Sequence, residues 1–266
     1  MVNPLVFNLA ALIALAPAAL LPLLRPTGRD GGFWGVLGLA VCAAVWWSAS
    51  QLTGSWQTNL SATLWVGIAA SLVLFAVIAA FHRQAWRLSP LLLAYLMLLG
   101  LMAALFVSAA GAPLPQSLSS GWIDSHILVS IASLAFLTVA ASAALASFLQ
   151  ARALKSKQPN GLTRMLPSVT DSERLFERLL LLAELVLGLG LATGMATQYG
   201  ENGRLLSFDH KTLLSLTGFV LIGLLLIGRR VCGVRGQIAA RTMLLAYSLI
   251  IIGYFGVKFV KQVLLS

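Results

Sequence analysis

Two histidines stand close to aspartates at the starts of apolar runs, in Asp124-Ser125-His126 and in Asp209-His210. Imidazole is a common axial ligand of haem iron, and a nearby carboxylate can fix its tautomer and raise its basicity as a ligand. His126 and His210 are therefore candidate axial ligands of one haem, with Asp124 and Asp209 as supporting cofactor-binding residues. The alternative is that both histidines are ordinary polar residues at helix starts, where the helix dipole also favours the aspartates.

Few other residues could take part in chemistry. His82 lies beside arginines and is expected in a loop. Glu184 falls near the start of an apolar run, where we expect a structural ion pair with a basic partner; an ion or proton pathway is the alternative. Cys42 and Cys232 form neither a metal motif nor a disulfide framework. No motif of hydrolytic or phosphoryl chemistry occurs, so the sequence predicts no catalytic residue and no enzyme.

The composition indicates which kind of element must position these side chains. Charged residues make up 10% of the chain and hydrophobic residues 59%, whereas a soluble domain carries about 25% charged residues. A chain of 266 residues this apolar cannot hide its apolar surface inside one soluble core. We therefore expect an all-α polytopic membrane protein, with residues 1–266 as a single transmembrane domain.

A spanning helix needs about 20 mostly apolar residues, and backbone groups in lipid must bond within their own segment. The chain contains eight such windows, so the sequence predicts a bundle of about eight transmembrane helices. They lie at about 4–24, 34–51, 61–81, 90–110, 124–150, 178–198, 211–228 and 242–262.

Basic residues fall on every second connection between these windows. Four connections hold most of the 18 Lys and Arg residues: Arg25, Arg29, Arg83, Arg87, Arg152, Lys155, Lys157, Arg164, Arg174, Arg178, Arg229, Arg230, Arg235 and Arg241. By the positive-inside rule these connections are cytoplasmic, which puts both termini, His126 and His210 on the extracytoplasmic side. The net charge of +10 is thus a topology signal. It predicts the lipid bilayer as partner and no nucleic acid.

Shorter signals refine the helix ends. Pro159-Asn160-Gly161 predicts a turn, and the spacing of Thr170 and Glu173 predicts a capping box at a helix start. Gly188, Gly190 and Gly194 predict close helix packing, with dimerisation as a weaker option. Five tryptophans near predicted span ends are expected to anchor at the membrane interface; these are Trp34, Trp56, Trp65, Trp86 and Trp122.

Three segments resemble the cytochrome c assembly proteins of the CcsA/CcmC type, best over 122–266 and closest to the short branch typified by the inner membrane protein YpjD. They are Asp124-Ser125-His126, Ser172-Glu173-Arg174 with Leu191-Ala192-Thr193-Gly194, and Phe208-Asp209-His210-Lys211-Thr212 with Gly233-Val234-Arg235-Gly236 and Gly253-Tyr254-Phe255-Gly256. The resemblance implies a multi-pass protein of the bacterial inner membrane that handles haem during cytochrome c maturation. It also implies that His126 is one of two axial histidines flanking an outer tryptophan-rich loop.

The chain departs from that pattern in its loop. The region at about 195–212 keeps Asp209 and Lys211 but lacks the family's tryptophans, with residues such as Tyr199 and Phe208 in their place. The chain ends where the second histidine is expected, and His210 stands where the family has proline. Two alternatives therefore stay open: a non-haem accessory subunit of another membrane protein such as a transporter, and a small transporter that uses Glu184.

Overall fold

The computed structural model describes residues 4–24, 28–52, 59–107, 121–203, 209–260 and 262, and these residues form helices joined by turns. Within them, eight helices are long and apolar enough to cross a membrane. The prediction of an all-α polytopic membrane protein is therefore confirmed. Four residues of the sequence analysis lie outside the described part: Arg25, Trp56, Phe208 and the side chain of Trp122.

The elements follow one another along the chain with short connections at one end of the bundle. The first four spans are α1 (Pro4–Leu24), α2 (Gly31–Leu52), α3 (Leu60–Phe81) and α4 (Ser89–Leu105), with the short helix η1 (Ala85–Leu88) leading into α4. The last four are α5 (Gly121–Ser156), α7 (Val169–Asn202), α8 (His210–Val231) and α9 (Gly236–Ile251). The short helix α6 (Gly161–Met165) precedes α7, while a π-helical turn, η3 (Ile252–Gly256), and α10 (Val257–Phe259) extend α9.

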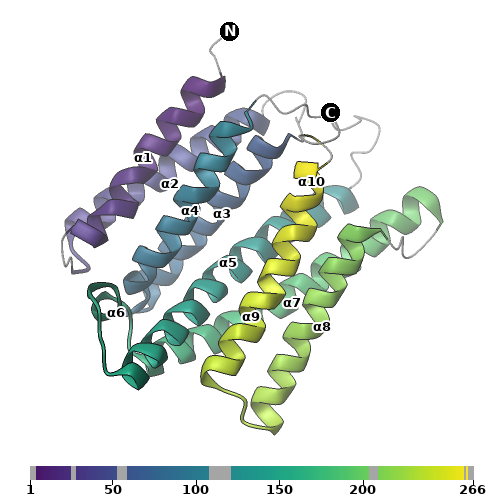
Figure 1. The fold of residues 1–266 in the computed structure, drawn as a ribbon. Coiled ribbons are helices and arrows are strands. Elements are labelled where there is room, and N and C mark those ends of the chain that lie inside the picture. Colours follow the sequence, from purple (N-terminus) through teal and green to yellow (C-terminus); the bar gives the residue numbers. More distant parts are fainter. Residues whose placement is uncertain are drawn as a thin grey trace.

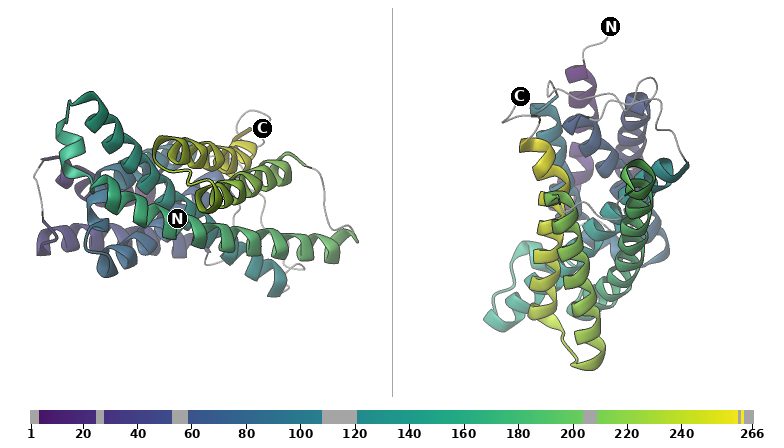
Figure 2. Two further views of the ribbon diagram at one scale, coloured as in Figure 1. Left: turned by 90° about the horizontal axis from the view of Figure 1, so that it is seen from below. Right: turned by 90° about the vertical axis from the view of Figure 1, so that its right-hand side faces the viewer.

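Helix α5 lies between two groups of helices. Figure 1 shows α1 to α4 on one side of it and α7, α8 and α9 on the other, and α5 contacts α3, α7 and α9. The Pro4 end of α1 and helix α10 lie at the same end of the bundle in Figure 1 and in the right-hand view of Figure 2, as an even number of spans requires. We call this the histidine end, because α5 and α8 begin there and carry His126 and His210 near their starts. The opposite end, with the α3–α4, α5–α7 and α8–α9 connections, is the arginine-rich end.

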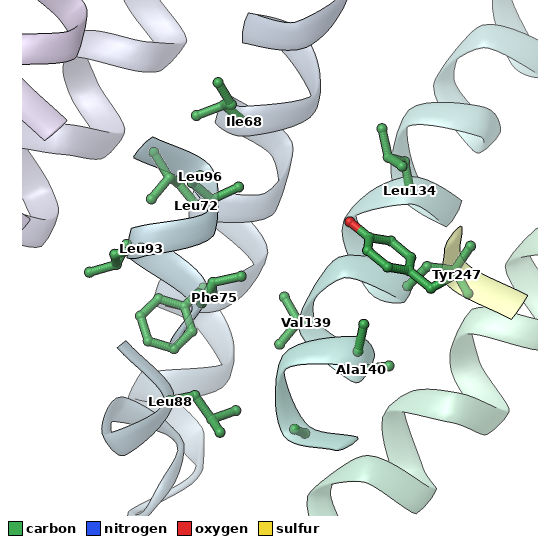
Figure 3. Packing of buried hydrophobic residues seen from close by; sticks show 14 of the residues in the cluster. Ile68, Leu72, Phe75, Leu88, Leu93, Leu96, Leu134, Val139, Ala140 and Tyr247 are labelled. Carbon is green, nitrogen blue, oxygen red and sulfur yellow. The ribbon is translucent and has the colours of Figure 1, made fainter. Parts of the chain in front are cut away.

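The core sits where α3, α4 and α5 meet. Ile68, Leu72 and Phe75 of α3 pack with Leu93 and Leu96 of α4, and all are fully buried (Figure 3). From the other side, the hydroxyl of Tyr247 on α9 donates to Tyr95 on α4 at 2.9 Å and lies 2.9 Å from that of Thr138 on α5. Because a polar group in lipid must find a partner inside the protein, these bonds tie α9 to α4 and α5.

Polar caps fix several helix starts, and two of them differ from the expectation. The side chain of Ser168 accepts the Asp171 N–H at 3.1 Å, so α7 begins at Val169 and the Thr170–Glu173 capping box does not form. Glu173 instead accepts the Gly236 N–H at 2.9 Å, which links α7 to the start of α9. The segment Pro159-Asn160-Gly161, expected to form a simple turn, leads into a helix. Asn160 forms a capping box with Thr163 and caps the start of α6.

Trp65 was expected at the membrane interface, and this is wrong. Its side chain is fully buried, and its indole N–H donates to Asn8 Oδ1 on α1. Asn8 also accepts the Ser61 hydroxyl at 3.2 Å. An indole N–H can be buried when a partner satisfies it, and Asn8 provides that partner. Trp34 and Trp86, in contrast, lie under the guanidinium groups of Arg29 and Arg87 at the arginine-rich end.

Candidate functional site

A cavity of about 630 Å³ lies at the histidine end, bounded by α5, α7 and α8. Its volume falls in the range of about 300–1,000 Å³ that small-molecule sites occupy. His126 of α5 lines it together with a glycine-rich stretch of α7 and the first turns of α8. The apolar walls include Leu191, Met195, Leu216 and Phe219, and the polar groups include Gln198, Asp209, Lys211 and Ser215. A mostly apolar cavity with a few polar groups at one end suits an amphipathic ligand.

His126 is held by two contacts to α7 that determine its tautomer. Its Nδ1 lies 3.1 Å from the carbonyl oxygen of Gly190 and 3.2 Å from Thr193 Oγ1. A carbonyl oxygen only accepts, so Nδ1 must carry the proton. The Thr193 hydroxyl itself lies within donating distance of the Leu189 carbonyl at 2.9 Å, which leaves its lone pairs for the imidazole. In the neutral ring Nε2 then keeps its lone pair, and none of the described residues hydrogen-bonds to it.

A glycine of α7 makes room for this imidazole. A Cβ on Gly194 would lie 2.9 Å from His126 Cε1, closer than real Cβ contacts, and 3.3 Å from Nδ1. A Cβ on Gly190 would meet the Ser133 hydroxyl at 3.5 Å and Val129 at 3.7 Å, which are ordinary van der Waals distances. Gly194 therefore provides the space for the ring, and Gly190 provides its carbonyl oxygen. The close approach of His126 to Gly194 fits the close helix packing that the sequence predicts.

A second, smaller cavity of about 90 Å³ adjoins the first and also has His126 and Lys211 in its wall. Tyr254, in the π-helical turn η3, forms another part of that wall. The Lys211 ammonium lies 5.6 Å from the centre of the Tyr254 ring, a cation–π contact. Single π-helical turns within α-helices are frequent at functional sites, and here the turn places Tyr254 next to the candidate histidine.

Asp209 and Lys211 bring charge to the mouth of the main cavity. Asp209 caps α8 by accepting the Thr212 N–H at 3.0 Å. Its hydrogen bonds from the side chain and backbone of Thr212 hold the pKa of the carboxyl below its ordinary value, and the neighbouring Lys211 acts in the same direction. The mouth thus presents a carboxylate fixed by the helix start beside a lysine that can meet an anionic group.

The four predicted cofactor-binding residues are not all brought together. His126 and Asp209 line the same cavity, whereas Asp124 and His210 are exposed and are not among the described residues that line either cavity. His210 is the first residue of α8, and successive residues on a helix point about 100° apart. The helix that turns Lys211 towards the cavity therefore turns its neighbour His210 elsewhere.

Glu184 lies well inside α7. Because α7 begins at Val169, Glu184 is about 22 Å along the helix axis from that start. It is half-buried against α8, with Oε1 3.1 Å from the position of a Cβ on Gly223. Its buried Oε2 has no hydrogen-bond partner among the described residues, and the ion pair found among them joins Arg229 and Glu177 instead. The expectation that Glu184 forms an ion pair is therefore wrong within the described part of the chain.

His82 lies at the arginine-rich end, where it ends α3. Its Nε2 lies 3.2 Å from the Arg178 guanidinium. This location agrees with the expected separation of His82 from the other two histidines.

The sequence analysis assigned no role in the site to three of its residues, although Thr193 and Tyr254 lie in segments that carry the family resemblance. Thr193 supports the imidazole, Met195 lines the main cavity, and Tyr254 lines the smaller one. The first two stand within a few positions of Gly190 and Gly194, so the glycine spacing was the available signal. Nothing in the sequence around Tyr254 indicates a π-helical turn.

Comparison with known proteins identifies a family for most of the chain. A sequence profile of the family described as cytochrome C assembly protein matches residues 33–265. A protein of Azospirillum brasilense, described as an uncharacterized 28.8 kDa protein in the nifR3-like 5' region, is 51% identical over 268 residues, which cover 98% of each chain. No solved structure matches. The matched range contains every residue that lines the two cavities.

Proposed function

The chain belongs to the cytochrome c assembly protein family, and we propose that it binds haem in the cavity at its histidine end, with His126 as an axial ligand of the iron. It is then a non-catalytic, haem-handling membrane component of cytochrome c maturation. Its placement in the short YpjD branch of the family stays a prediction. The observation that carries the proposal is the His126 imidazole, with Nδ1 bonded to Gly190 and Nε2 left with its lone pair.

This arrangement is the one that metal-binding histidines adopt. Such a histidine donates its second ring N–H to a carbonyl, a carboxylate or water, which fixes the tautomer and the ring orientation. His126 meets that requirement through Gly190 and Thr193. Haem would supply redox-active iron, while this chain would hold and orient it.

The rest of the cavity suits the other parts of haem. Leu191, Leu216 and Phe219 offer apolar surface to a porphyrin. Lys211 offers a cation to a propionate carboxylate at the cavity mouth. Phe219 and, in the smaller cavity, Tyr254 supply further aromatic surface, and this supports haem binding without the family's tryptophans.

The second axial position has two candidate ligands. The sequence predicts His210, but its exposed side chain is not among the described residues that line the cavity. Met195 does line it, and a methionine thioether is another common haem ligand. We expect His126→Ala to abolish binding and His210→Ala to leave the haem bound.

We also propose that the histidine end faces the extracytoplasmic side of a bacterial inner membrane. The positive-inside rule supports this orientation, because Arg and Lys concentrate at the opposite end. Single cysteines at Asp124 and Lys157, both exposed, test it in a chain with Cys42 and Cys232 replaced by alanine. An impermeant maleimide should label position 124 in intact cells and position 157 only after lysis; the reverse pattern would contradict the proposed orientation.

The absorption spectrum of protein purified from haem-replete cells tests the function itself. We expect a Soret band that is lost in His126→Ala and kept in His82→Ala, a matched change at the far end of the bundle. A wild-type protein without the band, or a His126→Ala protein that retains it, would contradict the proposal. Recovery of a stoichiometric membrane partner without haem would instead favour an accessory subunit.

A further inference from the structure

A second site lies at the arginine-rich end, outside the haem cavity. A cavity of about 370 Å³ opens there between the end of α3 and the first turns of α7. The charged or titratable residues in its wall are Arg83, Arg174, Arg178, His82 and Asp171. We call it the arginine pocket.

The arginines of this pocket come from two segments that are far apart in the sequence. Arg83 follows α3, whereas Arg174 and Arg178 lie one turn apart on α7. Topology alone requires basic residues somewhere on the cytoplasmic side. It does not require that guanidinium groups from separate connections converge on one cavity, where their like charges repel. The convergence therefore indicates a ligand that compensates them.

The protein itself offers these arginines little compensation. None of the three arginines forms an ion pair with a described residue. The ion pair found among the described residues joins Arg229 to Glu177. Asp171 is the one acid in the pocket wall, and its carboxylate accepts the Ser168 hydroxyl at 2.7 Å at the start of α7. The pocket thus carries a positive excess and faces the N-terminal end of α7, which adds a favourable dipole for an anion.

His82 orients one of these arginines. The Arg178 Nη1 lies 3.2 Å from His82 Nε2, and because a guanidinium has no acceptor, arginine donates and Nε2 accepts. This hydrogen bond holds the Arg178 side chain against the end of α3. The His82 Nδ1 then carries a proton and is a further donor. The pocket is built mainly of hydrogen-bond donors.

We propose that the arginine pocket binds a phosphate group. The planar guanidinium group can form two parallel hydrogen bonds to phosphate oxygens. Three guanidinium groups carry more positive charge than a single carboxylate would neutralise, which favours a phosphate over a carboxylate. The group belongs either to an anionic phospholipid headgroup or to a small soluble phosphorylated molecule. Phe81, which is 85% exposed beside the arginines, provides an apolar surface along which an acyl chain can lie.

Full-length protein, delipidated in a non-ionic detergent, permits a test with two probes. Native mass spectrometry measures retention of phosphatidylglycerol against phosphatidylcholine, and thermal unfolding measures stabilisation by inorganic pyrophosphate. The test variant is Arg83→Gln with Arg174→Gln. Its matched control is Arg152→Gln with Arg164→Gln, which removes equal charge from exposed residues at the same end but outside the pocket.

We expect the pocket variant to bind at least about tenfold more weakly than wild type, because charge-assisted hydrogen bonds are lost. The control should stay within about twofold, because Arg152 and Arg164 do not line the pocket. Arg174→Lys keeps the positive charge but loses the planar guanidinium group, so its affinity should lie between those of the pocket variant and the control. Retention of phosphatidylglycerol alone identifies a headgroup, and stabilisation by pyrophosphate identifies a soluble phosphate.

Equal weakening in both double variants, or binding of neither probe, would overturn the proposal and leave the arginines as a topology signal. The Soret band serves as an independent readout. It should be the same in all these variants, so failure of the phosphate site and failure of the haem site are distinguishable.

Discussion

His126 on α5 is bonded through Nδ1 to the backbone carbonyl of Gly190 on α7, at 3.1 Å. This contact joins the two longest helices at the level of the main cavity. It also sets the chemistry of the ring, because a protonated Nδ1 leaves the lone pair on Nε2. A backbone carbonyl cannot change its protonation, so the tautomer is determined by the fold.

Gly194→Ala should disturb the seat of the imidazole. The added methyl would lie 2.9 Å from His126 Cε1, so the ring must shift and its bond to Gly190 lengthen. Replacement of a helical glycine by alanine otherwise stabilises by about 0.5–1 kcal/mol. We expect Gly194→Ala to lack that gain in thermal unfolding and to shift or weaken the Soret band.

Gly200→Ala is the matched control on the same helix, because a Cβ there meets nothing within 4 Å. It should leave the Soret band unchanged and not lower the melting temperature. Identical spectra in Gly194→Ala and Gly200→Ala would show that the ring does not rest on Gly194.

Lys211→Gln should weaken the binding of haem about three- to fivefold, since an exposed charge pair contributes up to about 1 kcal/mol. The effect should depend on the propionates. Wild type should bind haem more tightly than haem dimethyl ester, in which the propionates carry no charge. Lys211→Gln should reduce this preference in a spectrophotometric titration. Lys155→Gln, at the far end, serves as the control. A wild-type protein that binds both ligands equally would remove the proposed role of Lys211.

Asp209→Ala should destabilise the protein by about 1 kcal/mol through loss of the α8 cap, whereas Asp209→Asn keeps a capping oxygen and should lose less. The pKa of Asp209 is lowered in the folded state by its bonds from Thr212, below the unfolded value of about 3.9. The carboxylate therefore stabilises the fold above that value, and the benefit is lost as the pH falls through the folded pKa.

Thermal unfolding of the two variants and wild type at pH 7 and pH 3 measures this difference. The difference in melting temperature between wild type and Asp209→Ala should be smaller at pH 3 than at pH 7. Asp124→Ala, which removes another exposed acid from a first helical turn, should show a smaller effect at pH 7. A gap of equal size at both pH values would mean that the ionised form of Asp209 does not contribute.

The eight spans could be predicted from sequence because lipid demands long apolar helices. The helix ends could not be predicted as well, since a helix continues beyond the membrane when polar caps satisfy its end. Helix α7 shows this, because Ser168 starts it nine residues before the predicted window at 178.

The candidate site could be predicted in part, and helix rotation limited the rest. His126 and Asp209 were identified by type and position, and both line the main cavity. His210 has the same local sequence signal as His126, yet the two side chains point in directions that depend on how α5 and α8 are rotated. Hydropathy does not encode that rotation. Trp65 is a similar case, because its burial depends on Asn8, which is 57 residues away.

The arginine pocket could not be predicted from spacing at all. His82 and Arg178 are 96 residues apart, and only the packing of α3 and α7 against α5 brings them together. The sequence explains why both lie at one end of the bundle, since the positive-inside rule acts on each connection separately.

Chemical rescue of His126→Gly tests the proposed iron ligand most directly. This change removes the side chain and leaves space that free imidazole can fill. The purified variant, loaded with haem, should lack the wild-type Soret position and regain it in a saturable way as imidazole is added, whereas His82→Gly should resemble wild type without imidazole. A wild-type spectrum for His126→Gly before any imidazole is added, or a folded variant that never responds to it, would contradict His126 as the ligand.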